Sequence, residues 1–149
     1  MNELINKIKE GTKIYIKGKE YIIYSKIWYS ILEDITVSYI KCELSENKVL
    51  VVIPDDNMIY IGEVIPQLNY KKISDNEISY NDRVFNKVGD GHQFITKIEF
   101  KGNTEVEGSC IFEDYENGDK IISLGILTDK NDEKADVYAE IINIYDIKI

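Results

Sequence analysis

The sequence has few cysteines and no long apolar run. It contains two cysteines, Cys42 and Cys110, which are too few and too far apart for a disulfide scaffold, so we expect buried thiols. No segment approaches the roughly 20 apolar residues of a membrane span. The opening residues, MNELINKIKE, lack the apolar run of a signal peptide. These absences favour a cytoplasmic protein without a membrane span.

Basic residues are also scarce. The chain carries 18 Lys and Arg against 27 Asp and Glu, for a net charge of −9. Residues 99–149 hold five lysines and thirteen acidic residues, a net charge of −8. Such a charge opposes binding to nucleic acid, whose affinity comes mostly from contacts to phosphate, and it repels anionic lipid. A basic protein partner or a cation suits this segment, although solubility alone also explains it.

The apolar pattern is mostly that of β-strands. Leu4, Ile5 and Ile8 share one face of a short N-terminal helix that Gly11 ends. After it, about ten β-rich segments alternate with turn signals every 6–12 residues. The connections are too short for helical crossovers, which predicts an all-β, mostly antiparallel fold. A chain of 149 residues makes one module, for which we expect no stabilising metal and no cofactor.

One segment of the sequence recurs. Residues 13–27 resemble residues 77–91 at an offset of 64, so that Ile14 aligns with Ile78, Tyr21 with Phe85, and the Gly18 turn with Asn81-Asp82. Chance matches also occur in β-rich chains. Read as a repeat, the pattern predicts two similar lobes, each a bent β-meander or small open barrel. The lobes span about residues 11–64 and 75–146, and about 65–74 connects them.

Several short motifs resemble, in order and spacing, the bacterial family called domain of unknown function 4178. They are GTKIYIKGKEY at residues 11–21, the strand from Tyr39 to Leu44, EVEG at 105–108, Asp114-Tyr115 and Ile122-Ser123-Leu124. Two positions depart from the family pattern: Val37 or Ser38 replaces a tryptophan, and Gly125 replaces an acidic residue. The resemblance implies a β-rich module of unassigned activity, often part of larger or membrane-stress-associated bacterial systems. It supplies no catalytic residues.

His92, in VGDGHQF, is the one histidine of the sequence and the candidate general base. Asp90 lies two positions before it and could orient the imidazole. The alternative interpretation is a turn at Gly89-Asp90-Gly91, followed by the first residue of a strand near solvent. Cys42 and Cys110 lie within expected strands without an adjacent cation, which argues against a nucleophilic thiolate.

Acidic and amide side chains after the last hairpin form a candidate cation loop. Asp129, Asn131, Glu133 and Glu140 match four ligand positions of a calcium loop. Lys134 occupies the position that needs glycine, and Glu140 falls in an expected strand. A solvated acidic loop is the alternative interpretation.

Eleven tyrosines and one tryptophan supply aromatic surface or core. Trp28 and Tyr29 precede an expected loop, and Asp114 and Glu116 lie in the acidic third, so these four are the candidate binding residues. The sequence therefore predicts a binding or scaffold module that recognises a protein partner through an acidic, aromatic β surface, and a basic partner would complement that charge. One variant is a small inhibitor or immunity-type protein. The alternative is an enzyme that acts on a small ligand with His92 as its base.

Overall fold

The fold is that of a computed structural model, and the residues described are 1–106 and 108–149. In chain order its elements are α1 (Asn2–Lys7), β1 (Lys13–Ile16), β2 (Lys19–Ile22), β3 (Lys26–Ile31), β4 (Asp34–Leu44), β5 (Lys48–Ile53), β6 (Met58–Ile65), β7 (Lys71–Ser74), β8 (Glu77–Tyr80), β9 (Arg83–Phe100), β10 (Ser109–Asn117), β11 (Lys120–Leu127), β12 (Glu133–Lys134), β13 (Asp136–Ile142), a 3₁₀ turn (Ile144–Asp146) and β14 (Ile147–Lys148). The all-β, mostly antiparallel fold with one short helix is confirmed. In the described residues, no helix is long and apolar enough to cross a membrane.

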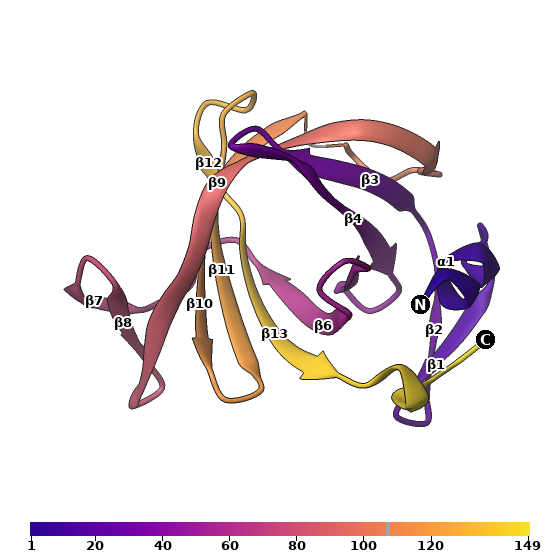
Figure 1. The fold of residues 1–149 in the computed structure, drawn as a ribbon, viewed down its shortest axis with the longest axis horizontal. Helices are drawn as coiled ribbons and strands as arrows, with labels where there is room; N and C mark the ends of the chain where they lie inside the picture. The colour runs from indigo at the N-terminus through magenta and orange to yellow at the C-terminus, as the bar shows by residue number, and fades with distance from the viewer. Residues whose placement is uncertain (107) are drawn as a thin grey trace.

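Eight antiparallel strands close into a barrel in the described part of the chain (Figure 1). Their order around the barrel is β3, β4, β5, β6, β13, β11, β10 and β9. The 18-residue strand β9 closes it, because its first half pairs with β10 and its second half with β3. Closure leaves no free edge on these strands.

The apolar run of β5, K-V-L-V-V-I, is explained by burial on both of its faces. Val49 and Val51 point into the barrel, while Leu50 and Val52 point outward. The outward residues join a large core with α1 and the hairpin of β1 and β2, which cover this side of the barrel (Figure 1). The side chain of Lys26 fixes α1 in place by donating from Nζ to the carbonyl oxygen of Ile5 at 2.7 Å.

A second outer core lies beneath the hairpin formed by β8 and the start of β9. Its buried members are Leu68, Ile78, Phe85, Tyr115, Ile122 and Leu124. Phe85 is fully buried, and burying a side chain of this size contributes roughly 1.5–3 kcal/mol. A β-hairpin therefore covers the outside of the barrel at two places, β1–β2 at the first outer core and β8 with the start of β9 at the second.

The two hairpins pair in the same register. Ile14 lies opposite Tyr21 in the first, and Ile78 lies opposite Phe85 in the second. Both turns use two residues with positive φ, as the right-handed twist of hairpins favours: Lys17 and Gly18 (52° and 80°), and Asn81 and Asp82 (50° and 61°). The barrel strands β3, β4, β5 and β6 follow the first hairpin, whereas the second hairpin runs directly into β9, which β10, β11 and β13 follow; the two sets share one interior. The predicted lobes are thus halves of a single barrel, and the duplication itself stays a prediction.

One local prediction is confirmed and one needs correction. The segment W-Y-S-I-L runs into a turn at residues 32–33, where β3 ends, and Trp28 to Ile31 themselves lie in β3 between β4 and β9. Residues 89–91 were interpreted as a turn between two strands, yet they continue β9 and pair with β10. There, pairing with a distant strand of the barrel outweighs the local turn signal.

Candidate ligand-binding cavity

The barrel encloses a cavity of about 270 Å³. Alternation along the strands sends every second side chain inward, so the wall combines residues from all eight barrel strands. The apolar part of the wall is Ile31, Val37, Val49, Val51, Ile53, Val88, Phe112 and Val137. The polar side chains are Tyr39, Lys41, Asp56, Tyr60, Asp90, Gln93, Asp114 and Ser123. The wall thus has eight apolar and eight polar side chains, and a combination of apolar surface with placed polar groups is typical of a small-molecule site.

Tyr39 forms a fixed part of this wall. Its ring stacks on that of Tyr29, with centroids 5.6 Å apart and planes inclined by 17°. Its hydroxyl donates a hydrogen bond to Oε1 of Gln93, which is also buried. Burial raises the pKa of Tyr39 above its ordinary value, with smaller contributions from Tyr60 and Asp114, so the phenol stays neutral and donates.

Asp114 holds the most unusual polar group in the cavity. Its Oδ1 atom is out of contact with solvent and has no hydrogen-bond partner among the residues that the structure describes. Leaving such a group unpaired costs roughly 1–3 kcal/mol. Burial raises the pKa of Asp114 to about 6, against the opposing effects of a hydrogen bond from Ser123 and the charge of Lys41. An unpaired buried acceptor in a cavity marks a place for a donor that comes from outside the chain.

A β-bulge accompanies Asp114. The pairing of β10 with β9 shifts between Asp114, opposite Gly89, and Tyr115, opposite Lys87. Bulges re-aim side chains and are frequent beside functional sites. Here Asp114 lines the cavity while Tyr115 packs in the second outer core.

Two further polar side chains belong to the surroundings of Asp114. Burial raises the pKa of Tyr60, and the nearby charge of Asp114 raises it further. The ammonium group of Lys41 lies 5.5 Å from the centroid of the Tyr29 ring, a cation–π distance. The cavity lining therefore contains a carboxylate, a neutral phenol and an ammonium group.

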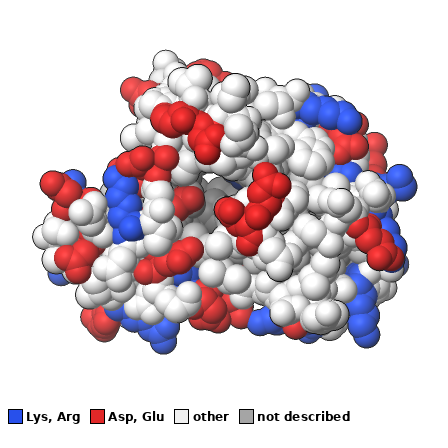
Figure 2. Space-filling view, in the orientation of Figure 1, with Lys and Arg blue, Asp and Glu red and all other residues white. Residues whose placement is uncertain are grey.

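Acidic side chains gather on one face of the barrel. Figure 2 shows Asp and Glu side chains around the central hollow, which lies within the ring of strands in Figure 1. Asp56, in the turn between β5 and β6, and Asp90, in β9, also line the cavity. The cavity lining thus includes three aspartates and one lysine, so its formal charge is negative.

The four predicted binding residues lie in different places. Asp114 lines the cavity, and Tyr29 is buried inside the barrel against Tyr39. Trp28 points to the outer core, and its Nε1 atom donates to Oε2 of Glu99 at 2.7 Å. Glu116 follows Asp114 on β10 but is not among the cavity residues. Sequence reasoning missed Tyr39, Tyr60 and Gln93 as site residues, because only barrel closure brings these strands together.

His92 and Asp90 do not act as a pair. The Nδ1 atom of His92 contacts Oε1 of Glu33, and the backbone N–H of His92 donates to Oε2 of Glu33 at 2.9 Å. Asp90 forms an ion pair with Lys87 at 2.8 Å. The His92 side chain is 47 % exposed and lies in the middle of β9, not at a strand start. It is absent from the cavity lining, although its neighbour Gln93 contributes to it.

The candidate calcium ligands have separate contacts. Oδ2 of Asp129 accepts a hydrogen bond from the N–H of Gly108 at 2.8 Å. Glu140 instead pairs with Lys17 at 2.6 Å and with Lys120 at 3.7 Å. Asn131 lies in a turn with positive φ, and Glu133 is exposed on β12. Within residues 1–106 and 108–149, no three His, Cys, Asp or Glu side chains gather to form a metal site.

Both cysteines are buried, and neither forms a disulfide. Burial raises the pKa of Cys42 to about 12, which keeps its thiol protonated. Cys42 lies in the outer core beside α1, away from the cavity lining.

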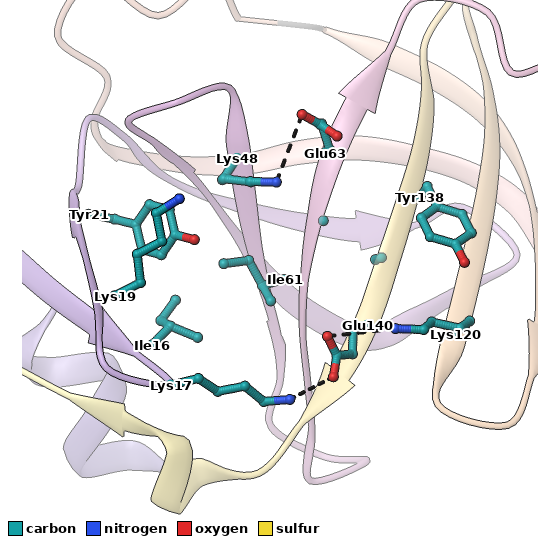
Figure 3. A pocket seen from close by; sticks show the side chains of 12 residues that line it. Ile16, Lys17, Lys19, Tyr21, Lys48, Ile61, Glu63, Lys120, Tyr138 and Glu140 are labelled. Atoms are coloured by element: carbon teal, nitrogen blue, oxygen red, sulfur yellow. Dashed lines mark hydrogen bonds and ion pairs between the residues drawn. The ribbon is translucent and has the colours of Figure 1, made fainter.

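A groove on the outer surface lies between the β1–β2 turn and strands β6 and β13 (Figure 3). Lys17, Lys19, Lys48 and Lys120 line it, together with Glu63 and Glu140. Each of these lysines already forms an ion pair: Lys17 and Lys120 with Glu140, Lys48 with Glu63 at 3.8 Å, and Lys19 with Glu46 at 3.3 Å. The groove is therefore a set of contacts between the first hairpin and the barrel, with its charges largely paired.

Comparisons with known proteins give no relative: no family model, no curated protein and no solved structure matches the chain.

Proposed function

We propose that the protein is a binding protein that holds one small molecule inside its barrel. The unpartnered Oδ1 atom of Asp114 in the cavity is the observation that carries this proposal. A chain that only needed a packed core would be more stable with an apolar residue there, because an unpaired buried acceptor destabilises the fold.

The architecture supports the same function. Eight-stranded barrels have interiors that side chains either fill or leave open for one small ligand. This interior retains about 270 Å³, slightly below the usual size range of ligand pockets. Stacking of Tyr29 on Tyr39, and the Tyr39–Gln93 hydrogen bond, hold part of the wall in one conformation before a ligand arrives.

Titration with the neutral dye Nile red, followed by its fluorescence, tests the proposal. We expect saturable binding at one site per chain in the wild-type protein. Val37→Trp should abolish it, because Val37 lines the cavity and an indole there fills the space. Val84→Trp is the matched control, since Val84 lies on β9 outside the cavity and is 43 % exposed. Equal binding by both variants, or no binding by the wild-type protein, would count against a ligand site in the barrel.

An enzyme is the second candidate. For this candidate we propose Asp114 as the general base in place of His92. Its pKa is raised to about 6, close to neutrality, and it lines the cavity together with Tyr60. Conversion of a bound ligand that stops in Asp114→Asn while binding persists would support this candidate.

Five expectations that came from composition and motifs remain proposals, in addition to the ligand-binding protein and the enzyme. They are recognition of a protein partner through the acidic surface, a cytoplasmic location, a bacterial source, an internal duplication and membership of the domain of unknown function 4178 family. Burial of Tyr29 removes one of the two aromatic side chains on which the partner surface was based.

A further inference from the structure

The proposed cavity has a chemical preference that follows from its charges. The unpaired atom in it is a carboxylate oxygen, an acceptor that requires a donor. Asp56 adds a second carboxylate to the lining. Asp90 adds a third, which Lys87 already pairs at 2.8 Å, and acidic side chains surround the hollow on the face in Figure 2. These groups attract cations and repel anions on their way into the barrel.

Lys41 does not cancel this preference. Its ammonium group lies 5.5 Å from the Tyr29 ring centroid, and Oδ1 of Asp114 remains without a hydrogen bond in its presence. Asp114 therefore has an acceptor left for a second cationic donor. With Asp90 paired to Lys87, the lining still has two further aspartates, Asp56 and Asp114, against the one lysine, Lys41.

Aromatic rings complete the site. Tyr39, Tyr60 and Phe112 line the same cavity as Asp114. Aromatic faces attract ammonium and guanidinium groups, and they also pack against an apolar ligand body. A neutral ligand could use the apolar wall alone, but it would make no use of the carboxylates.

From these observations, which rest on the proposed ligand-binding function, we propose that the barrel binds a small organic cation. The ligand carries a primary ammonium or guanidinium group on an apolar body. Its N–H group donates to Oδ1 of Asp114, and its apolar body lies against the rings and aliphatic side chains of the wall.

Three probes of similar shape and different charge test this inference: phenethylamine, 2-phenylethanol and phenylacetate, titrated by calorimetry. We expect the amine to bind at least about 10-fold more tightly than the alcohol, and phenylacetate to show no binding, since charged hydrogen bonds are the stronger ones. Sodium chloride should weaken binding of the amine and leave binding of the alcohol unchanged.

Asp114→Asn should remove the difference between amine and alcohol. Asp75→Asn, a change of the same kind at an exposed turn, should preserve it. If Asp114→Asn fails to fold, the carboxyl ¹³C signal of Asp114 in the wild-type protein replaces it: the amine should shift this signal and the alcohol should not.

The outcomes separate the two proposals. Nile red binding without a preference for the amine would overturn the cationic ligand and leave the cavity as a ligand site. An amine preference that survives in Asp114→Asn would also overturn it. Failure of Nile red and of all three probes to bind would reject both proposals together.

Discussion

The ring of Tyr39 stacks on that of Tyr29 while its hydroxyl donates to Gln93 on the facing strand β9. One side chain thus connects β3, β4 and β9 inside the barrel. Gln93 and Tyr39 are both buried, so neither can exchange this hydrogen bond for one to water without opening the barrel. The wall of the cavity is therefore positioned by a polar contact and not by packing alone.

Tyr39→Phe should destabilise the protein by roughly 1–3 kcal/mol, because it leaves Oε1 of Gln93 buried without a donor. Urea denaturation followed by circular dichroism measures the loss. Tyr24→Phe is the control, since Tyr24 is 43 % exposed and lies outside the barrel strands. Equal stabilities for the two variants would show that the Tyr39 hydroxyl does not stabilise the fold.

The raised pKa of Asp114 should make the free energy of unfolding depend on pH. Its pKa in the folded protein is raised to about 6, whereas an unfolded aspartate titrates near 3.9. Between these values the folded state binds more protons than the unfolded state, so this carboxyl destabilises the fold as pH rises from about 4 to about 6. The contribution is about 2–3 kcal/mol, from 1.36 kcal/mol per pKa unit.

Comparison with Asp114→Asn isolates this contribution, because the other titrating groups are common to both proteins. The free energy of unfolding of the variant, relative to the wild-type protein, should rise by about 2–3 kcal/mol between pH 4 and pH 7. A difference that stays constant over this pH range would mean that Asp114 has an ordinary pKa in the folded protein.

His92→Ala should alter one neighbouring group and leave the cavity intact. Hydrogen bonds from His92 lower the pKa of the Glu33 carboxyl, so the substitution should raise that pKa toward the ordinary value, as an NMR titration can measure. Nile red affinity should change by less than about twofold, the range of a surface substitution. A tenfold loss of affinity would place His92 in the binding site after all.

Local patterns predicted much of the secondary structure. The turns at Gly18 and at Asn81-Asp82 were predicted from local sequence, because a tight hairpin turn depends on residues that are neighbours in the chain. The sequence D-I-T-V-S-Y-I-K-C-E-L also predicts one strand over residues 34–44, and β4 has these bounds. The β-rich pattern around residues 21–24 predicts core packing for Tyr24, but Tyr24 lies just past the end of β2 and is exposed.

The candidate site was much less predictable. Alternation along residues 92–100 puts every second side chain from His92 to Phe100 on one face and predicts that Ile98 points inward. Register shifts between β3 and β9 interrupt this alternation, so that Ile98 is exposed and Gln93 is buried. Asp114 was selected for its charge on an acidic surface, and it lies inside the barrel. Which strands meet around the cavity depends on closure between β9 and both β3 and β10, a long-range pairing that alternation along one strand does not encode.

At Gly125 on β11, the residue that precedes β13 packs so closely that there is no room for a side chain. A Cβ atom at this position would lie 2.5 Å from the carbonyl oxygen of Ala135 and 3.1 Å from Sγ of Cys110. Backbone cannot move aside cheaply here, because the N–H of Ala135 donates to the carbonyl oxygen of Gly125. The acidic residue that the resembled family carries at this place would meet the same obstruction.

Gly125→Ala should therefore destabilise the protein by roughly 1–3 kcal/mol, the usual cost of overpacking. Gly89→Ala is the matched control, since a Cβ atom there meets nothing within 4 Å and the backbone is outside the left-handed region. It should leave stability unchanged or raise it by up to about 1 kcal/mol, because alanine restricts the unfolded chain. Thermal unfolding of both variants measures the difference. If Gly125→Ala proved as stable as Gly89→Ala, the close approach of Ala135 to β11 would be refuted, and an acidic side chain at position 125 would become compatible with this barrel.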